Sequence, residues 1–280
     1  MRLGPVLIDG VPTDHAAVPL DDIAVQRGYG CFETIRSYRG VPFRADRHLA
    51  RLAVSAERLG MPLPPQDDLP AWVSDRAAEG DCSVRVIVTG GVDAEHPGTG
   101  SHTLVFAESL PSLPEAMRLL PVVAPWHPDG AWSGLTGAKT LSYAPNMEAK
   151  LAATRSGFDD AVLIGRSGTV LEGPNSSIAW IRGDRLEYPE LELGVLDSIT
   201  VAAVCELSPG VGLRPTPGRF LLDRMLDADE IMSLSTLRQV KPVVTVGDRP
   251  FDRGERTAAL AEAFDDLVVH ERRLEGVLDP

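Results

Sequence analysis

Lysine is rare in this chain, and its rarity is the first indication of chemistry. Three of the 27 basic residues are lysines, at positions 139, 150 and 241, and the others are arginines. A guanidinium stays charged, whereas the amine of a buried lysine can lose its proton, act as a nucleophile and form a Schiff base. Each lysine therefore marks a position where an arginine could not have served the same purpose, unless the three lysines are placed at random.

Lys139 is the strongest candidate for such an amine. It lies in SGLTGAKTLSYAPN, a stretch of small and apolar residues with no acid to pair it, and burial there would lower its pKa and free the amine. Lys150 follows Glu148 on a predicted helix and is expected on the surface, whereas Lys241 precedes Pro242 at a predicted strand start. A plain structural role for Lys139 is the alternative.

Two charged residues could serve the same ligand as this amine. Glu172, in GTVLEGPNSS, is an acid at the end of a predicted strand where the chain turns. Arg51, in RHLARL, lies on a predicted helix beside apolar residues that face the core, so part of its side chain can point inward. An exposed turn acid and a surface arginine are the alternative interpretations.

Two further segments suit an anion. Ser198, Ile199 and Thr200 open a predicted helix, whose free N–H groups and dipole attract negative charge. Ser235 and Thr236 end a predicted strand and could add hydroxyl donors. Ordinary helix capping explains the first segment equally well. An amine, a carboxylate and a cup of cationic, amide and hydroxyl donors are the parts of a pyridoxal 5'-phosphate site.

The elements that must position these residues fall into two predicted groups. The first is a meander of short strands with turns at 9–10 and 39–40, followed by a helix closed by Gly60, a second helix over 67–79 and the strands CSVRVIVTG and HTLVFAES. The second follows a proline-rich linker near 111–114 and contains a helix closed by Gly157. After it we expect the strands AVLIG, TVLEG, SSIAWIRGD, RLEYP, EIMSLS and KPVVTV and the helices SITVAAVCEL, FLLDRMLDADE and ERTAALAEAFDDLVVHERR. The predicted fold class is α+β, with domains over residues 1–112 and 113–280.

Composition narrows the function classes. With 280 residues, 44% of them hydrophobic and 24% charged, the chain is expected to be globular, with two α/β lobes and a cleft between them. No run is long enough to span a membrane, and the N-terminus turns polar too early for a signal peptide, so we expect a cytoplasmic protein without a membrane partner. The net charge of −13 would repel a phosphate backbone, so we expect no nucleic-acid partner. We also expect no metal site, because the three cysteines lack zinc spacing and the histidines are scattered, at positions 15, 48, 96, 102, 127 and 270.

The order of these motifs resembles the class IV, or fold type IV, aminotransferases, which include D-amino-acid and branched-chain aminotransferases and aminodeoxychorismate lyase. The resemblance runs from about residue 7 to about residue 248. It rests on GYGCFETIR, FRADRHLARL, AKTLSY, TVLEGPNSSI, LDSIT and DEIMSLSTLRQVKPV, in this order.

The resemblance implies a role for each candidate residue. Lys139 becomes the Schiff-base lysine and proton shuttle, Glu172 the partner of the pyridine nitrogen, and Arg51 a phosphate ligand. Ile199, Thr200 and Thr236 complete the phosphate cup, and Ser198 and Ser235 remain as further cofactor-binding candidates. The resemblance also implies a homodimer.

Some positions depart from the family pattern. Where relatives often have GDG, this chain has GYG at 28–30, and Ser177 and Val201 stand where Asn and Arg are usual. D-amino-acid aminotransferases hold the substrate carboxylate with an Arg and a His, but Glu95 and Pro97 occupy these places here, on either side of His96. That carboxylate trap is therefore absent or rebuilt.

Three residues remain as substrate candidates. Arg36 would point toward the cleft if strand alternation holds through Phe32 and Thr34, and the other sheet face is the alternative. Tyr29 and Tyr143 could line the pocket or belong to the core.

The predicted function is an aminotransferase that moves an amino group between an amino acid or amine and a 2-keto acid. Aminodeoxychorismate lyase, which releases pyruvate and 4-aminobenzoate, is the alternative. Against the lyase, the sequence offers no evident second cation for two substrate carboxylates. A catalytically silent protein with this fold would lack the lysine or the acid, and both are present.

Overall fold

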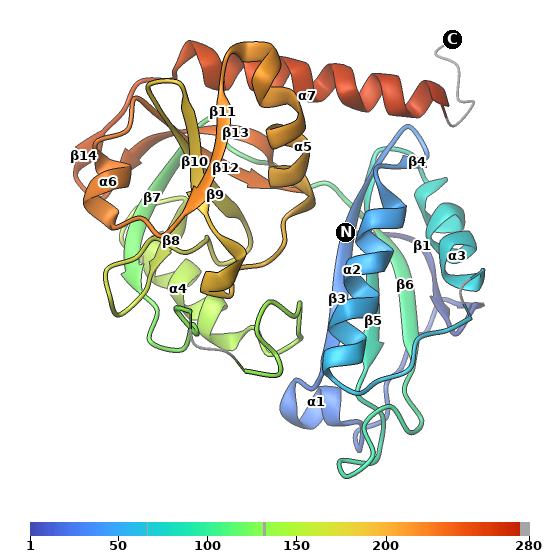
Figure 1. The fold of residues 1–280 in the computed structure, drawn as a ribbon. Helices are drawn as coiled ribbons and strands as arrows, with labels where there is room; N and C mark the ends of the chain where they lie inside the picture. Colours follow the sequence, from blue (N-terminus) through green and yellow to red (C-terminus); the bar gives the residue numbers. More distant parts are fainter. Residues whose placement is uncertain (66, 131–132, 275–280) are drawn as a thin grey trace. The chain divides into compact units, whose positions relative to one another are not determined.

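The computed structural model describes residues 1–65, 67–130 and 133–274. The chain forms two compact units, shown in Figure 1. The first unit contains Met1–Pro111, Ala138–Tyr143 and Val268–Pro280, and the second contains Ser112–Gly137 and Ala144–Leu267. The predicted domain boundary after residue 112 stays a prediction. The short segment 138–143, which carries the candidate lysine, thus belongs to the first unit although the chain on both sides of it belongs to the second.

The first unit is built on a six-stranded antiparallel sheet in the order β2-β1-β6-β5-β3-β4. The strands are β1 (Arg2–Ile8), β2 (Val11–Thr13), β3 (Gly30–Tyr38), β4 (Val41–Pro42), β5 (Cys82–Thr89) and β6 (Thr103–Ser109). The helices are α1 (Ile23–Arg27), α2 (Ala45–Arg58) and α3 (Asp68–Ala77). Helix α2 packs on β3, and α3 packs on β5 and β6. The predicted meander and both predicted helices are confirmed.

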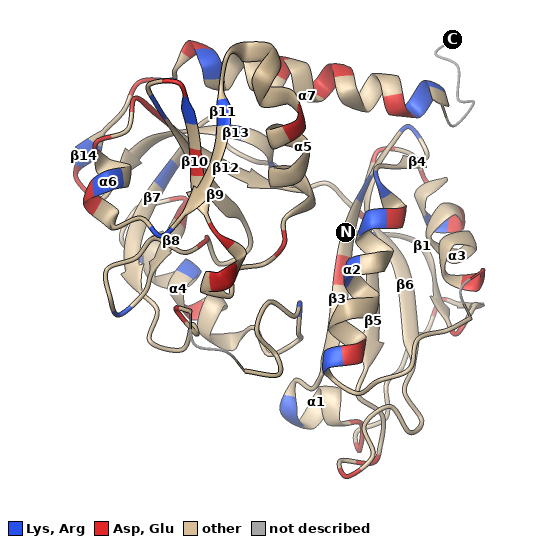
Figure 2. Ribbon diagram, viewed as in Figure 1, with Lys and Arg blue, Asp and Glu red and all other residues tan. Residues whose placement is uncertain are grey.

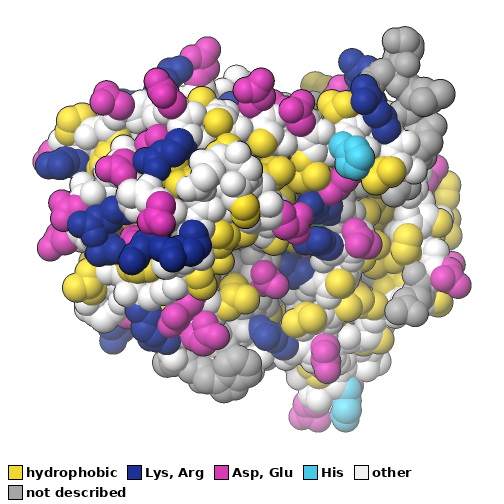
Figure 3. Space-filling view, turned by 45° about the horizontal axis from the view of Figure 1, so that its top comes forward, with side chains coloured by type: hydrophobic (Ala, Val, Ile, Leu, Met, Phe, Trp, Pro, Cys, Tyr) yellow, Lys and Arg dark blue, Asp and Glu magenta, His cyan; other side chains and the backbone are white. Residues whose placement is uncertain are grey.

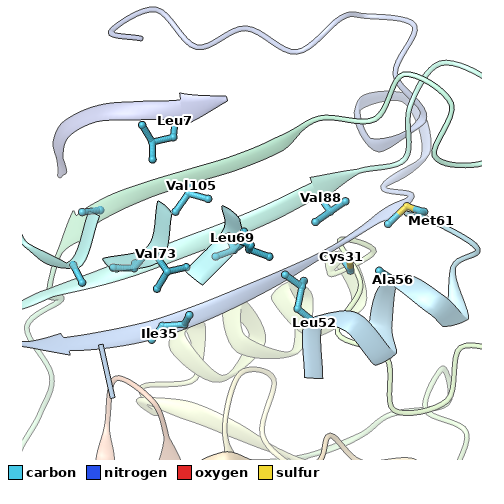
Figure 4. Packing of buried hydrophobic residues seen from close by; sticks show 14 of the residues in the cluster. Leu7, Cys31, Ile35, Leu52, Ala56, Met61, Leu69, Val73, Val88 and Val105 are labelled. Atoms are coloured by element: carbon cyan, nitrogen blue, oxygen red, sulfur yellow. The ribbon is translucent and has the colours of Figure 1, made fainter. Parts of the chain in front are cut away.

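Alternation along β3 decides which side chains enter the core of this unit. Cys31 and Ile35 point to the helix side and are fully buried against Leu52 and Ala56 of α2 (Figure 4). Burial raises the pKa of the Cys31 thiol to about 12, so the thiol is neutral. The even-numbered residues of β3 therefore lie on the opposite face of the sheet.

The second unit contains an eight-stranded mixed sheet in the order β11-β10-β9-β12-β13-β7-β8, with β14 paired to β13. Its strands are β7 (Met117–Val123), β8 (Asp160–Ile164), β9 (Ser177–Arg182), β10 (Arg185–Pro189), β11 (Arg214–Gly218), β12 (Glu230–Ser235), β13 (Gln239–Val246) and β14 (Arg249–Pro250). The helices are α4 (Ala144–Arg155), α5 (Ile199–Leu207), α6 (Leu222–Leu226) and α7 (Glu255–Leu274), the last of which ends in residues assigned to the first unit. Helix α4 packs on β8, and α5 packs on β12.

Three sequence expectations need correction in the second unit. The predicted strand TVLEG forms only isolated bridges, from Thr169 to Leu221 and from Val170 to Ile164, because the chain turns at once into the loop that follows. The predicted helix FLLDRMLDADE is restricted to the five residues of α6. Strands β7 and β11 were not predicted because they contain prolines, which β11 tolerates as an edge strand.

Charged side chains are distributed over both units. Figure 2 shows acidic and basic segments along β3 and α2 in the first unit. In the second unit Arg214 pairs with Asp184 at 3.3 Å and Arg219 with Glu190 at 2.6 Å, and Figure 3 shows acidic and basic side chains interspersed over one face of it. Within the described residues, no helix has the length and apolar character that crossing a membrane requires.

Candidate active site

The backbone of Lys139 is held on both sides within the first unit. Its N–H donates to Ser55 Oγ on α2 at 3.0 Å, and its carbonyl accepts from the Phe32 N–H at 3.0 Å. A bridge between Cys31 and Thr140 continues this pairing along β3. The Lys139 Nζ lies 4.4 Å from the centroid of the Phe32 ring. The lysine is therefore fixed to β3 and α2 of the first unit by contacts made across about a hundred residues of sequence.

Gly30 makes this attachment possible. The Leu141 N–H donates to the Gly30 carbonyl at 2.8 Å. A Cβ at position 30 would lie 2.6 Å from the Val88 carbonyl oxygen and 2.7 Å from Leu141 Cδ1. A side chain there would push the lysine segment away from β3, so the second glycine of the GYG motif serves close packing.

Arg51 is engaged with a buried acid that the sequence analysis did not single out. Its Nε donates to Glu33 Oε1 at 2.7 Å and its Nη2 donates to Glu33 Oε2 at 2.9 Å. His48 Nδ1 lies 2.9 Å from the same Oε2, and the Glu33 side chain is fully buried. Burial alone would raise the pKa of Glu33, but Arg51 and His48 lower it to about 2. Burial lowers the pKa of His48.

A sequence signal for this network did exist. Glu33 stands between Cys31 and Ile35 on the core face of β3, and an acid at a core position requires partners because isolated buried charge is costly. One turn apart on α2, His48 and Arg51 supply them. Two of the five N–H donors of Arg51 are thus committed to Glu33, and its predicted role as a phosphate ligand stays a prediction.

Arg36 shares its sheet face with a second arginine. Strand pairing places Arg85 of β5 opposite Thr34 of β3, on the face that also carries Phe32 and Arg36. The Arg85 guanidinium lies 5.1 Å from the Phe32 ring centroid, over which Lys139 Nζ also lies. The buried Nε of Arg85 has no hydrogen-bond partner among the residues that the structure describes. The sequence analysis missed Arg85, although alternation in CSVRVIVTG separates it from Val84 and Val86.

The two candidate tyrosines differ in their surroundings. Tyr143 meets Phe32 edge to face, with ring centroids 5.4 Å apart, and its ring centroid lies 5.9 Å from Lys139 Nζ. Tyr29 instead packs against the core and donates its hydroxyl to the Leu59 carbonyl at 3.0 Å. The structure therefore brings Tyr143 to the lysine, whereas the Tyr29 hydroxyl is occupied at the end of α2.

The loop at 90–100 carries acids at the place where the D-amino-acid enzymes hold the substrate carboxylate with an Arg and a His. Glu95 is exposed, and its N–H and that of His96 donate to Asp93 Oδ1 at 2.9 and 3.2 Å. The His96 ring contacts Asp93 Oδ2 at 2.9 Å, and Pro97 offers no donor. A carboxylate held on the first unit would need other cations, and Arg36 and Arg85 lie on one sheet face.

Glu172 is fixed in the second unit by two neighbours. Its Oε2 accepts from the Leu196 N–H at 3.1 Å, and its Oε1 lies 3.6 Å from His127 Nε2. The side chain is 17% exposed, so the carboxylate is partly accessible. Gly173 and Ser176 close the turn that follows, through a 2.6 Å backbone hydrogen bond.

The predicted anion site at 198–200 lies near this acid. Ser198 is the N-cap of α5, and its Oγ accepts from the Val201 N–H at 3.3 Å, which confirms the predicted cap. The Ile199 and Thr200 amides occupy the first turn, where helix geometry leaves them without a partner inside the helix. Glu172 and Ser198 line one cavity of about 530 Å³. The two unusual residues, Ser177 and Val201, line it as well.

Ser235 and Thr236 follow at the end of β12, the strand on which α5 packs. Ser235 Oγ accepts from the Arg238 N–H at 3.1 Å and so shapes the turn. The Arg238 guanidinium is buried and binds the fully buried Asp160. It also donates to Ser176 Oγ at 2.9 Å, Ser233 Oγ at 3.1 Å and Asn175 Oδ1 at 2.8 Å. Arg238 thus connects the turn after Glu172 to the turn at 235–238.

Comparison with known proteins identifies this arrangement. The model of the family described as amino-transferase class IV matches residues 30–246. A bifunctional aminodeoxychorismate lyase / D-amino acid transaminase of Mycobacterium tuberculosis is 29% identical, over 96% of this chain and 98% of that protein. A putative branched-chain-amino-acid aminotransferase of Methanocaldococcus jannaschii is 27% identical, over 92% and 93%. The solved structure of a fold IV transaminase from Curtobacterium pusillum superposes with a TM-score of 0.85 at 28% identity, covering 95% of this chain and 92% of that one.

These similarities confirm the predicted α+β fold of type IV. Membership of the class IV aminotransferases confirms the predicted cofactor, pyridoxal phosphate. The donor set of the chain fits that cofactor. The second unit places a partly buried acid and a helix N-terminus on one cavity, which suits a ligand with a basic ring nitrogen and a phosphate. The first unit supplies an amine whose backbone is held at both its N–H and its carbonyl.

Proposed function

The chain belongs to the class IV aminotransferase family, and we propose from this premise that Lys139 is the lysine on which its pyridoxal phosphate chemistry depends. The observation that carries the proposal is the position of Lys139 Nζ, 4.4 Å from the Phe32 ring centroid on the sheet face that also bears Arg36 and Arg85. The Arg85 guanidinium lies over the same ring, 5.1 Å from its centroid, and guanidinium groups on this face can hold the carboxylates of a substrate.

The cofactor, when bound, supplies an aldehyde for the amine and a ring that draws electrons from the substrate Cα. Glu172 would hold the ring nitrogen and, as an anion, keep it protonated. The phosphate would be held by the amides of Ile199 and Thr200, by Ser198, Ser235 and Thr236, and by Arg51. Helix α5 favours the anion at its N-terminus.

Lys139 then performs the proton transfers of the reaction. Its Nζ takes up the proton that leaves the substrate Cα and releases it again in the same half-reaction, so one group serves as base and then as acid. The Ser55 and Phe32 hydrogen bonds hold the backbone of Lys139 while the side chain moves. Tyr143 and Phe32 exclude water from one side of the amine.

Two experiments test the proposal: one removes the amine by substitution, and the other identifies the lysine that is bound to the cofactor. Lys139→Ala should abolish the visible absorbance of the purified holoenzyme, and Lys150→Ala, with its amine in another part of the chain, should retain it. Hydride trapping followed by peptide mapping should place the label on residue 139. A label on another lysine, or an unchanged spectrum in Lys139→Ala, would refute the assignment.

Transamination between an amino acid or amine and a 2-keto acid is the reaction we propose, with aminodeoxychorismate lyase as the second candidate. The observation that favours the lyase is Arg85, which provides the second cation beside Arg36 that a substrate with two carboxylates requires. One similar protein is named for both a lyase and a D-amino acid transaminase activity. Conversion of the cofactor to its pyridoxamine form by amino donors identifies a transaminase, because simple elimination does not require it.

We also propose a cytoplasmic homodimer. The proposal is supported by the resemblance of the chain to its family. Sedimentation of the holoenzyme should give a dimer, and a fully active monomer would contradict the proposal.

A further inference from the structure

His127 is a buried histidine of the second unit to which the proposed function assigns no role. Its side chain is 8% exposed, and its Nε2 lies 3.6 Å from Glu172 Oε1. The other carboxylate oxygen accepts the Leu196 N–H at 3.1 Å. Each oxygen of Glu172 therefore faces one nitrogen, and the two nitrogens come from different loops.

The hydrogen bond at the other ring nitrogen of His127, Nδ1, determines whether Nε2 carries a hydrogen toward Glu172. Nδ1 accepts from the Asp129 N–H at 3.3 Å. A nitrogen that accepts a hydrogen bond carries no hydrogen, so in the neutral ring the hydrogen lies on Nε2. His127 thus presents an N–H to Glu172. The separation of 3.6 Å is longer than a hydrogen bond, so the ring limits the movement of the carboxylate and stabilises its charge through space without taking up a lone pair.

The loop that carries His127 is fastened to the turn that follows Glu172. Trp126 Nε1 donates to Asn146 Oδ1 on α4 at 3.1 Å, and Asn146 Nδ2 donates to the Pro174 carbonyl at 3.0 Å. The His127 N–H donates to the Ala124 carbonyl at 3.0 Å. One asparagine side chain therefore holds both the histidine loop and the Glu172 turn, which sets their separation.

We propose that His127 is a positioning residue for Glu172, which keeps the carboxylate directed at the ring nitrogen of the cofactor. This inference rests on the proposed role of Glu172 and deepens it. A carboxylate that can rotate must be ordered each time the cofactor binds, whereas one confined between the Leu196 N–H and the His127 ring is already ordered. A carboxylate has lone pairs for more than two donors, so both neighbours leave room for the ring nitrogen.

The test measures cofactor binding and the state of its ring nitrogen, without recourse to turnover. The apoenzyme is titrated with ¹⁵N-labelled pyridoxal phosphate, and the ¹⁵N chemical shift of the bound ring is recorded. His127→Phe keeps a ring but removes the N–H, His127→Gln restores a donor amide, and His127→Ala is a second apolar variant in case the phenylalanine does not fold. His270→Phe, at an exposed position on α7, is the matched control. Glu172→Ala tests the premise.

We expect His127→Phe and His127→Ala to raise the cofactor Kd about fivefold, the loss of roughly one polar contact, and to move the ¹⁵N shift toward that of the unprotonated ring. His127→Gln and His270→Phe should stay within about twofold of the wild type. Wild-type values in both apolar variants, together with a changed ¹⁵N shift in Glu172→Ala, would overturn this inference alone. An unchanged shift in Glu172→Ala would overturn the role of Glu172, and this inference with it.

Discussion

The Arg51 guanidinium donates two hydrogen bonds to the fully buried Glu33 carboxylate, from Nε to Oε1 at 2.7 Å and from Nη2 to Oε2 at 2.9 Å. Two parallel hydrogen bonds fix both planes, which a single point charge could not do. The consequence for the cofactor is that any donor that Arg51 presents to a phosphate has a fixed direction. If Arg51 holds the phosphate as proposed, Glu33, a core residue, orients the guanidinium that does so.

Breaking this pair should affect both stability and cofactor retention. Glu33→Gln leaves Arg51 without its buried counter-charge, and loss of one partner of a buried ion pair costs about 3–5 kcal/mol. Arg51→Lys keeps the positive charge but should still lower stability and cofactor retention, because an ammonium cannot make the two-point contact. Urea midpoints and cofactor Kd values measure the two effects. If Glu33→Gln lowered the midpoint but left the Kd unchanged, Arg51 would not be a phosphate ligand.

The same network predicts acid sensitivity. The pKa of His48 lies below its ordinary value of 6.5 and that of Glu33 is lowered from 4.5 to about 2. In both cases the unfolded chain binds the proton more readily, so stability is lost as pH falls, first below about 6.5 and then from about 4.5 toward 2. Each group contributes a slope of at most about 1.4 kcal/mol per pH unit.

Urea midpoints measured from pH 8 to pH 3 would show this sensitivity. The slope above pH 5 should shrink in His48→Gln, because the titrating group of that window is gone. His270→Gln removes an exposed imidazole and should keep the wild-type profile. Identical profiles for His48→Gln and the wild type would show that His48 does not titrate with folding.

Gly30→Ala tests the attachment of the lysine segment to β3. The added Cβ would lie 2.6 Å from the Val88 carbonyl oxygen, which is backbone and cannot move aside easily. We expect a loss of about 1–3 kcal/mol from overpacking and a weaker visible absorbance of the holoenzyme, because the segment that carries Lys139 is displaced. Gly210→Ala is the matched control, since the described residues leave open space around its added Cβ. Equal spectra in the two variants would contradict the packing argument.

Much of this architecture follows from sequence patterns. Alternation in FETIR and CSVRVIVTG predicts which residues of β3 and β5 share a face, and Ser198 marks the start of α5, as observed. The contacts that join distant segments do not follow from local patterns. The pairing of Thr140 with Cys31 and the pairing of Glu33 with Arg51 and His48 depend on tertiary packing, which periodicity does not encode.

The Arg238 guanidinium and Asp160 offer a comparison of buried and exposed ion pairs. Asp160 is fully buried with Arg238, whereas its neighbour Asp159 pairs with Arg118 at 3.3 Å, where the arginine is 52% exposed. Arg238→Met should cost about 3–5 kcal/mol, because it removes the buried partner of Asp160 and leaves only Lys150, 3.9 Å away, as a counter-charge. Arg118→Met should cost less than about 1 kcal/mol. Adding Asp160→Leu to Arg238→Met should recover part of the loss. Urea midpoints of the four proteins decide this, and equal losses for both arginines would refute the distinction.

Substrate selection should depend on the two arginines of the sheet face that carries Phe32. If Arg36 and Arg85 hold two carboxylates, Arg85→Leu should raise the KM for a dicarboxylic keto acid, such as 2-oxoglutarate, about tenfold or more, the value of a charged hydrogen bond. Arg36→Leu should raise the same KM. In one of these two variants, Arg36→Leu or Arg85→Leu, the KM for pyruvate should rise less than the KM for 2-oxoglutarate, because a monocarboxylic acid needs only one cation. The cofactor Kd should remain at its wild-type value in both variants.

Arg249→Leu, at an exposed position on β14, is the control for loss of one positive charge. It should leave the KM values for both keto acids unchanged, since long-range attraction between exposed charges is screened by salt. Equal KM increases for 2-oxoglutarate and pyruvate in Arg36→Leu and in Arg85→Leu would mean that both arginines hold the same carboxylate. The chain would then lack a separate site for a second carboxylate, and the lyase alternative would lose the observation that favours it.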